Sequence, residues 1–525
     1  MIHRAPTLPG IVLVLAVLVA HASLFPKIAD PDAFYHFGHA AAYAEGSIFD
    51  TSFPWATQSV IADRGADLWW GFHVALVPIA ALDSVAWGIR LAALMLTVLL
   101  VGSFYVALRR HSVESATWWT LVFFLAVPNV LFRQVMLRPH MLSLAGALLL
   151  LAVLVRGRWW QAALLGAAVA WVHIGLAWAP IAVAVAYAFV RAVERGLVVP
   201  RAPESVAPIT AIAAVTLGVG AGWLLRPHPI DTAALAGVQI IRLLAEKATE
   251  EPLTFAAELY PLSLGELTRT SWLFLIAWLA AIGVAIHGVA TGGLRARPEQ
   301  RTLLVSALLV STAFLLLTLF SARRAMEYWV AFGALAFPFL WDQVRTLTAR
   351  RAVRAAGALV LAGHLGWGAW RYALNVELVA SPPDTMAQVA DFLEGQATPG
   401  DVVFHAKWDN FGPLLAHNRT SRYLGGMDPV FQLAHDSRRY WEFFYLSADL
   451  NTEWTCDAFP CASGDANDTH RVLTDHFGAR WVVVEPYRNP RFSLYLLNDP
   501  RYRLALETQR EAVFEVLPDP DAPTL

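Results

Sequence analysis

The chain has 525 residues, of which 57% are hydrophobic and 15% are charged, whereas soluble domains carry about 25% charged residues. This balance excludes a disordered chain, a collagen and a coiled coil, and it argues against a purely soluble enzyme. The net charge of −2 offers no basic field for nucleic acid, so the composition predicts a polytopic membrane protein.

Eleven apolar runs approach the length of about 20 residues that a helix needs to cross the hydrocarbon. They lie near 9–25, 84–107, 117–133, 139–155, 159–176, 178–193, 207–225, 271–289, 302–321, 328–341 and 355–373. The first run could be a signal peptide. We interpret it as a retained helix, because it lacks a clear small-residue cleavage site and ten more runs follow.

Positive charge in alternate short loops predicts the orientation, since cytoplasmic loops are enriched in Lys and Arg. The loops on one side carry Arg109, Arg110, Arg156, Arg158, Arg191, Arg195, Arg201, Arg295, Arg297, Arg301, Arg345, Arg350, Arg351 and Arg354. We therefore expect a cytoplasmic N-terminus and an extracytoplasmic, periplasmic segment after about residue 375. The Ala-, Arg- and Trp-rich composition suggests a bacterial plasma (inner) membrane.

Three segments do not fit a plain bundle. Two are long outer loops, 26–83 and 227–270. Residues 68–82 of the first are too short to span and are expected along the membrane surface, and residues 232–247 of the second have helical spacing. The third is a polar tail, 378–525, long enough for one soluble domain. The expected division is a transmembrane domain, 1–377, and an outer domain, 378–525.

The tail has the pattern of a mixed α/β domain. Helices are expected at 385–394 and 472–477, strands at 401–405 and 481–484, and strand pairs after the turn at 498–500. Cys456 and Cys461 stand in the run CDAFPC. An oxidising outer compartment favours a disulfide between them, two free thiols being the alternative.

The first outer loop opens with KIADPDAFYHFGHA, in which Asp30 and Asp32 flank a proline and His36 and His39 follow. Carboxylates spaced i, i+2 on extended backbone can both reach one hard cation, and ionisable groups at a membrane edge are often functional. The alternative is a solvated turn, since Asp and Pro are common turn residues.

A second group of candidates surrounds the turn between the third and fourth spans, RQVMLRPHMLS. Arg138 can bind phosphate oxygens, and His140 can ligate a metal through a neutral nitrogen. Equally, the arginines could mark the membrane interface and His140 could be structural.

Further charged residues lie in the other outer segments. Glu258 has the most apolar context of the carboxylates in the second long loop. Arg323 and Arg324 lie on the outer side, against the positive-inside bias, where they suit an anionic head group or act as snorkelling anchors. Arg226 and His228 form a weaker candidate of the same kind.

The run KWDNFG follows a predicted strand in the tail and contains Trp408 and Asp409. Loops on a rigid scaffold often carry binding residues. A structural turn with a packed Trp is the alternative interpretation.

These residues together resemble the GT-C glycosyltransferases that use polyprenyl-linked donors, and most closely the catalytic subunit of bacterial and archaeal oligosaccharyltransferases. The ADPDAFYH run resembles the first acidic motif of that family, with Asp32 at the position of the metal-binding and catalytic Asp and Asp30 beside it. His140 resembles the end of the second acidic motif, and Glu258 the loop glutamate. KWDNFG is similar to the WWDYG signature, but Lys407 replaces its first Trp.

The resemblance implies a GT-C-like bundle with an outer α/β domain, and an enzyme that transfers a sugar or oligosaccharide from a polyprenyl (pyro)phosphate. It implies Mg²⁺ or Mn²⁺ held by Asp32 and Asp30 with His140, and a catalytic role for Glu258. Donor phosphate would be bound by Arg138, Arg226 and His228, and acceptor by Trp408, Asp409, Arg323 and Arg324. The acceptor could be a protein Asn, or a lipid-linked glycan or envelope polymer. A lipid-linked saccharide transporter and a non-catalytic relative are the rival hypotheses.

Overall fold

The computed structural model describes residues 8–82, 84–196, 205–249, 253, 255–291, 296–344, 351–462 and 464–519. Contacts within the chain divide it into two compact units. Unit 1 contains Met1–Ala29, Arg90–Arg226 and Ala257–Ala380, and unit 2 contains Asp30–Ile89, Pro227–Ala256 and Ser381–Leu525. Most of both long loops is therefore grouped with the tail, and each unit combines segments that are far apart in the sequence.

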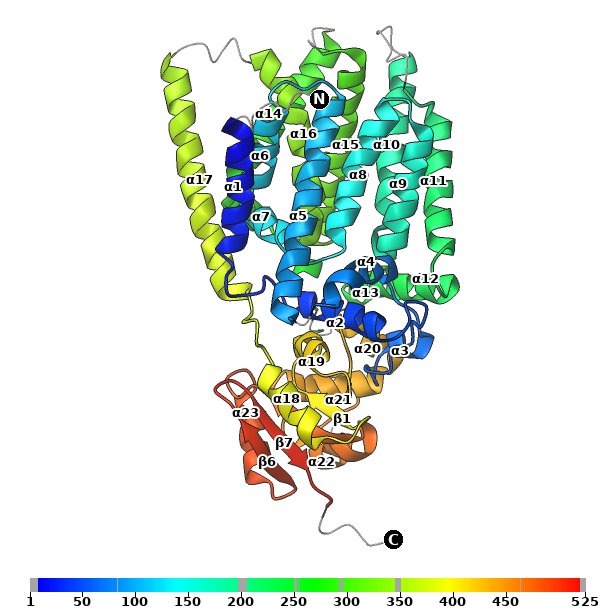
Figure 1. Ribbon diagram of the computed structural model, residues 1–525, viewed down its shortest axis with the longest axis vertical. Helices are drawn as coiled ribbons and strands as arrows, with labels where there is room; N and C mark the ends of the chain where they lie inside the picture. The colour runs from blue at the N-terminus through cyan, green and yellow to red at the C-terminus, as the bar shows by residue number, and fades with distance from the viewer. Residues whose placement is uncertain are drawn as a thin grey trace. The chain divides into compact units, whose positions relative to one another are not determined.

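Unit 1 is helical in its described part. Its α-helices are α1 (Leu8–Ala22), α5 (Val85–Arg110), α6 (Ala116–Leu125), α7 (Pro128–Gln134), α8 (His140–Val155), α9 (Trp159–Val172), α10 (Trp178–Gly196), α11 (Pro208–Leu224), α14 (Leu264–Ala290), α15 (Pro298–Phe320), α16 (Met326–Val344) and α17 (Arg351–Val379). Short turns of 3₁₀-helix are η1 (Ile174–Leu176), η3 (Ala257–Leu259) and η4 (Arg323–Ala325). Helices α8, α9, α10 and α11 lie side by side (Figure 1).

Four helical segments in the described residues are long and apolar enough to cross a membrane: Val85–Arg110, Ile174–Arg195, Leu264–Ala290 and Pro298–Phe320. The number rises to six if each of two bent helix pairs is one span. These helices agree with a multi-pass membrane protein. Predicted runs coincide with helices, as 302–321 does with α15, while the total of eleven crossings stays a prediction.

The run at 117–133 differs from the single span that the sequence predicts. It forms two helices, α6 and α7, bent by 100° at Ala126–Val127. Pro128 is the first residue of α7, and Val127 before it is extended, with φ −139° and ψ 119°. A proline disfavours the helical conformation in the preceding residue and has no N–H for the ladder, so the helix stops there and restarts in a new direction.

Small residues allow α11 to approach α9 closely. A Cβ added at Gly218 or Gly222 would lie 2.1 Å from the carbonyl oxygen of Ala163 or Ala167, respectively. The pair forms a G-x-x-x-G pattern, which lets helix backbones meet in membrane proteins. Any side chain at these glycines would force the two helices apart.

Unit 2 mixes short helices with a sheet. Its helices are α2 (Asp32–Glu45), α3 (Val60–Arg64), α4 (Trp70–Ala80), α12 (Pro229–Gly237), η2 (Val238–Arg242), α13 (Leu243–Glu246), α18 (Ala387–Gln396), η6 (Trp408–Asn410), α19 (Phe411–His417), α20 (Pro429–His435), α21 (Ser437–Ser447), α22 (Thr469–Arg471), η7 (Val472–His476) and α23 (Pro490–Asn498). Its strands are β1 (Val402–His405), β2 (Arg422–Tyr423), β3 (Trp454–Thr455), β4 (Asn467–Asp468), β5 (Ala479–Val484), β6 (Tyr502–Glu507) and β7 (Ala512–Val516).

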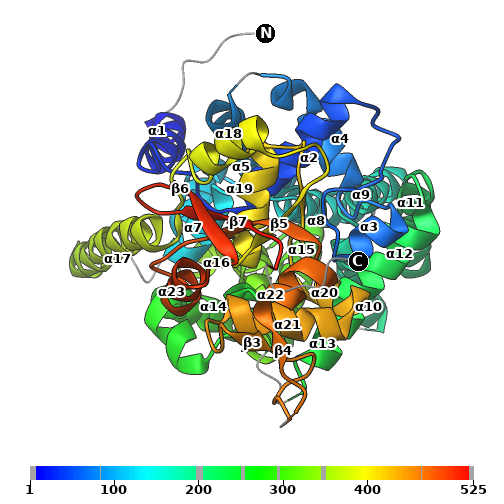
Figure 2. The same ribbon diagram turned by 90° about the horizontal axis from the view of Figure 1, so that it is seen from below.

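Five strands form a mixed sheet in the order β2-β1-β5-β7-β6. β1 is parallel to β2 and β5, whereas β7 is antiparallel to β5 and β6; Figure 2 shows β6 and β7 side by side. The strands predicted at 401–405 and 481–484, the strand pair after residue 500 and the helical stretch at 232–247 are confirmed. The tail is the mixed α/β region that the sequence predicts.

The first loop continues the edge of this sheet within unit 2. Ala56 forms a parallel bridge with Tyr423, and the Thr57 amide donates to the Tyr423 carbonyl at 2.8 Å. The Trp55 indole donates to the Arg419 carbonyl at 2.8 Å. The loop and the tail of unit 2 therefore share one set of backbone hydrogen bonds.

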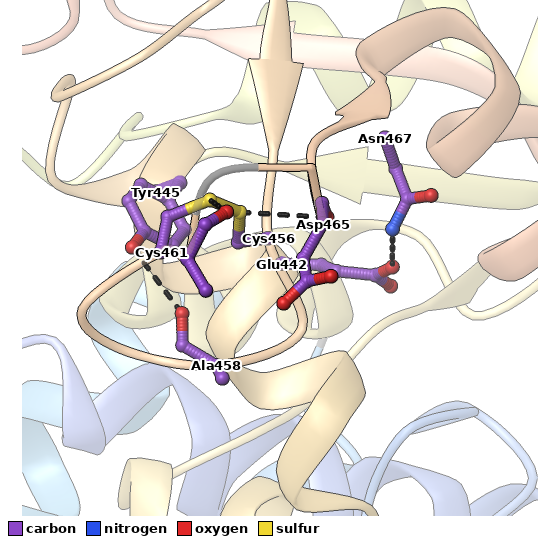
Figure 3. The surroundings of a disulfide bond; sticks show 8 residues. Glu442, Tyr445, Cys456, Ala458, Cys461, Asp465 and Asn467 are labelled. Carbon is purple, nitrogen blue, oxygen red and sulfur yellow. Dashed lines mark hydrogen bonds between the residues drawn. A yellow bond between two sulfur atoms is a disulfide. The ribbon is translucent and has the colours of Figure 1, made fainter.

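Cys456 and Cys461 form a disulfide that closes the CDAFPC loop beside α21 (Figure 3). Tyr445 donates to the Ala458 carbonyl inside this loop at 3.2 Å. Cys456 is fully buried. The cross-link therefore secures a short loop onto the aromatic face of α21.

Candidate functional site

A cluster of five ionisable side chains joins five segments of unit 1. Arg133 lies in the last turn of α7, Arg138 lies in the turn that follows, and His140 begins α8. Glu258 lies in η3, and Glu327 lies in the first turn of α16. The cluster, which we call the ion-pair cluster, consists of Arg133, Arg138, His140, Glu258 and Glu327.

Arg133 is the centre of the ion-pair cluster because its guanidinium contacts both Glu258 and Glu327. Arg138 Nη1 donates to Glu258 Oε1 at 2.5 Å, and His140 Nε2 lies 2.8 Å from Glu327 Oε2. The side chains of Arg133, Arg138 and Glu258 are only 15–17% exposed. Charges this sheltered are stable only when they are paired.

The protonation state of Glu258 follows from its partners. Burial alone would raise the pKa of this carboxyl, but the charges of Arg133 and Arg138 outweigh burial and hold the pKa well below its usual range. Glu258 is therefore ionised at neutral pH. It can bind a cation or orient an arginine, whereas a proton donor would need a raised pKa.

The remaining cationic candidates have varied surroundings. In unit 1, Arg226 is buried, and its Nη1 donates to the carbonyls of Ala170 and Trp171 at 3.0 and 2.7 Å. Arg323 Nη1 lies 3.3 Å from Glu266 Oε1 with both side chains 35% exposed. In unit 2, His228 precedes α12 in the left-handed conformation, with φ 48°.

The acidic pair of unit 2 forms the start of α2. Asp30 is buried, and its Oδ1 accepts a hydrogen bond from the Asp32 amide at 2.9 Å. This bond satisfies one of the amide groups that a helix N-terminus leaves without an internal partner. Two carboxylates supply the hard oxygen donors that Mg²⁺ and Mn²⁺ prefer, so the donor set fits such an ion.

A second cluster in unit 2 was not predicted as a unit. His39 from α2, Asp67 from the turn before α4 and His73 from α4 each offer a ligand atom, and these atoms lie within 4.8 Å of one another. We call it the His–Asp cluster. All three residues are buried. His39 lies in the candidate acidic run of the first loop, whereas Asp67 and His73 lie outside it; the spacing H-x₂-H followed by D-x₅-H is the signal in the sequence for such a His/Asp site.

Hydrogen bonds place the carboxylate of the His–Asp cluster. Asp67 Oδ1 accepts from the Trp69 amide at 2.8 Å, and Oδ2 accepts from the Tyr43 hydroxyl at 3.0 Å. Oδ2 also lies 2.6 Å from His73 Nδ1. Burial lowers the pKa of His39 to about 3, so its imidazole is neutral at neutral pH.

The KWDNFG run lies on the turn that follows β1. Arg488 Nη2 donates to both carboxylate oxygens of Asp409 at 3.1 and 2.9 Å. Lys407 Nζ donates to the Ser447 carbonyl, while Trp408 packs on the core of the sheet. Most polar groups of this run are therefore engaged within unit 2.

Gly412 at the end of the run allows α19 to pack on the start of α2. A Cβ added there would lie 3.0 Å from the Pro31 carbonyl oxygen and 3.1 Å from the Tyr35 amide nitrogen. Such distances are shorter than ordinary carbon contacts. The glycine is thus required by close packing beside the acidic pair.

The fold belongs to a known class. The sequence matches no family model and no curated protein. Solved structures, in contrast, match over most of the chain and share its fold; they include an oligosaccharyltransferase and ArnT.

The oligosaccharyltransferase of Archaeoglobus fulgidus in the apo form is 11% identical, with a TM-score of 0.55 over 91% of this chain and 69% of that chain. The same enzyme tethered with an acceptor peptide containing the NVT sequon gives a TM-score of 0.56, at 11% identity over 90% and 68% of the two chains. ArnT from Cupriavidus metallidurans bound to undecaprenyl phosphate is 14% identical, with a TM-score of 0.52 over 96% of this chain and 97% of that chain.

Proposed function

We propose that this protein is a membrane glycosyltransferase that moves a sugar or oligosaccharide from a polyprenyl (pyro)phosphate donor to an acceptor on the outer membrane face. The observation that carries the proposal is the fold match to ArnT bound to undecaprenyl phosphate, which spans 96% of this chain. The ion-pair cluster supports it, because guanidinium groups match phosphate oxygens in geometry and charge.

Arg138 is the strongest candidate for the donor phosphate. It lies in a turn, and its partner Glu258 is an anion. We propose that the phosphate replaces or shares this partner when donor binds. Arg226 and His228 are weaker candidates, since Arg226 already bonds two backbone carbonyls.

Asp32 and Asp30 are proposed to hold Mg²⁺ or Mn²⁺. A divalent cation, when bound, neutralises the negative charge that develops on a departing phosphate. Asp32 is also proposed to orient the acceptor and take its proton. The acceptor atom then bonds to the anomeric carbon with inversion, and the carbon–oxygen bond to phosphate breaks with its electron pair leaving on the phosphate.

The proposed acceptor belongs to one of two classes. The first class is an Asn of a protein, and the second is a lipid-linked glycan or an envelope polymer. One observation favours the second class. Arg488 already engages both oxygens of Asp409, so a Ser or Thr hydroxyl of a sequon would have to compete with it at the KWDNFG run. Trp408, Arg323 and Arg324 are candidate contacts for either acceptor.

The test compares a deletion strain of the source organism that carries wild type, Asp32→Asn or Asp50→Asn. Asp50 is an exposed acid of the same loop and serves as the matched control. Lipid-linked saccharides and outer glycoproteins are profiled by mass spectrometry. We expect Asp32→Asn alone to accumulate donor and to lose the product.

The class of product that disappears identifies the acceptor. Loss of glycopeptides indicates a protein acceptor, and loss of an elongated lipid-linked or envelope glycan indicates the other class. Full rescue by Asp32→Asn would overturn the proposal and would favour a transport or binding role.

A further inference from the structure

One buried nitrogen of the His–Asp cluster has no hydrogen-bond partner. His39 is 1% exposed, and its Nε2 makes no hydrogen bond. Buried polar atoms are nearly always paired, so an exception calls for an explanation such as an ion. When the imidazole carries its proton on Nδ1, which lies 3.3 Å from the Tyr35 hydroxyl, Nε2 presents a lone pair that a metal ion can accept.

The distances around this nitrogen fit two ligands of one metal ion. His39 Nε2 lies 3.6 Å from Asp67 Oδ2, which is too long for a hydrogen bond. Two ligand atoms that each lie about 2.1 Å from a tetrahedral ion are about 3.4 Å apart. The observed separation is therefore close to what a shared ion requires.

His73 supplies the third ligand atom, Nδ1, and His36 contacts the other ring nitrogen of His73. His36 Nδ1 is 2.8 Å from His73 Nε2. A histidine that ligates a metal through one nitrogen usually donates the other N–H to a partner. His73 Nδ1 now lies 2.6 Å from Asp67 Oδ2, a hydrogen bond that a bound ion would replace by moving the two atoms apart. With Nδ1 bound to the ion, the Nε2–H of His73 can donate to His36, which is the outer partner that such a ligand needs.

We propose that His39, Asp67 and His73 bind a transition-metal ion of the zinc type, which joins α2 to α4. Two imidazoles and one carboxylate suit Zn²⁺, whereas Mg²⁺ prefers oxygen ligands. The Tyr43 hydroxyl, 3.0 Å from Asp67 Oδ2, or a water supplies the fourth ligand. This site is separate from the cation proposed at Asp30 and Asp32, and it stands whether or not the chain transfers sugars.

A metal ion at the His–Asp cluster would help to hold in place α2, the helix that begins at Asp32. Asp32 and His39 are seven residues apart on one helix, which is about two turns, so they share a face. An ion that ties His39 to α4 would fix the rotation of α2. The ion would therefore stabilise the packing of α2 against α4 in unit 2.

The first experiment measures metal content in the full chain. The protein is purified in detergent through a tag without histidines, and metals are counted by inductively coupled plasma mass spectrometry. We expect about one zinc per wild-type chain and less than about a tenth of this content in His39→Ala. His435→Ala, which changes a histidine of α20 that pairs with Asp63, should retain the metal.

The second experiment keeps the proposal testable if His39→Ala does not fold. Wild type is stripped with a chelator, and its Tm is measured after addition of Zn²⁺ or of Mg²⁺ at equal concentration. We expect Zn²⁺ to raise the Tm by more than Mg²⁺ does, because an ion that binds only the folded state stabilises it and Mg²⁺ is expected only at the acidic pair, not at two imidazoles. The proposal is overturned if wild type carries no stoichiometric metal and Zn²⁺ leaves its Tm unchanged, or if His39→Ala folds and retains as much zinc as wild type.

Discussion

Arg138 donates a hydrogen bond to Glu258 across 2.5 Å, although the two residues are 120 positions apart in the chain. The bond links the turn before α8 to η3 in the second long loop. Under the proposed function, an incoming donor phosphate would compete with Glu258 for this guanidinium. Any donor that binds Arg138 must therefore alter this contact.

Replacing Arg138 should weaken binding of a polyprenyl phosphate. We expect Arg138→Ala to raise the Kd for undecaprenyl phosphate by about tenfold or more, because charge-assisted hydrogen bonds are strong and directional. Binding is measured by the shift in Tm of purified protein as the lipid is titrated. Arg158→Ala, at an exposed position before α9, is the control, and an equal loss in both variants would contradict a specific role for Arg138.

Breaking the centre of the ion-pair cluster should destabilise unit 1. Arg133→Met leaves Glu258 and Glu327 without their shared partner. Each keeps one other partner, Arg138 and His140 respectively, so the loss of stability should stay below the cost of an uncompensated buried charge, which is about 3–5 kcal/mol. We expect a clear fall in Tm in thermal unfolding. The double variant Arg133→Met with Glu327→Gln should recover part of this loss, and a double variant as unstable as the sum of both single changes would argue against their coupling.

Two glycine-to-alanine changes in unit 2 should have opposite effects. Gly412→Ala forces a Cβ to within 3.0 Å of the Pro31 carbonyl oxygen, and such overpacking costs about 1–3 kcal/mol. Gly395→Ala in α18 has open space around the new Cβ and should stabilise by up to about 1 kcal/mol. Chemical unfolding of both variants checks the signs, and stabilisation by Gly412→Ala would refute the packing argument.

His405 should make unit 2 sensitive to acid. Burial lowers its pKa from 6.5 to about 4, although hydrogen bonding to the Lys407 carbonyl partly opposes this. Because the folded pKa is below the unfolded one, the unfolded chain takes up the proton first as the pH falls. The stabilisation is complete above about pH 6.5 and is lost toward about pH 4.

The size of this effect can be isolated with one substitution. When the pH falls from about 7 to about 5, protonation of His405 alone should lower the free energy of unfolding by about 2 kcal/mol. The pH dependence of Tm in wild type is compared with that of His405→Gln, which does not titrate. A variant with the same acid sensitivity as wild type would exclude His405 as the cause.

Much of the fold could be predicted because its signals are local. The strand β1 at Val402–His405 and the helical stretch around 232–247 follow from hydrophobic periodicity over a few residues. Pro128 is visible in the sequence, but the apolar run 117–133 predicts a single span, whereas the structure bends there. The length of an apolar run alone does not reveal where a helix bends.

The functional candidates were predicted unevenly. Asp30, Asp32, Arg138 and Glu258 were named from their context. Glu327, which contacts Arg133 and His140, was not named, and Asp67 was not connected with His39. No local pattern predicts such pairs, because each partner lies on a different helix or turn.

The sequence by itself determined the class of protein, since each apolar residue contributes additively to the free energy of entering a membrane. It also identified the acidic pair, whose two members are neighbours in the chain. Only the tertiary structure decided which charges share partners, because packing brings Arg133 to Glu327 across 194 positions. The same is true of the His–Asp cluster, whose three ligand atoms meet only when α2 folds against α4.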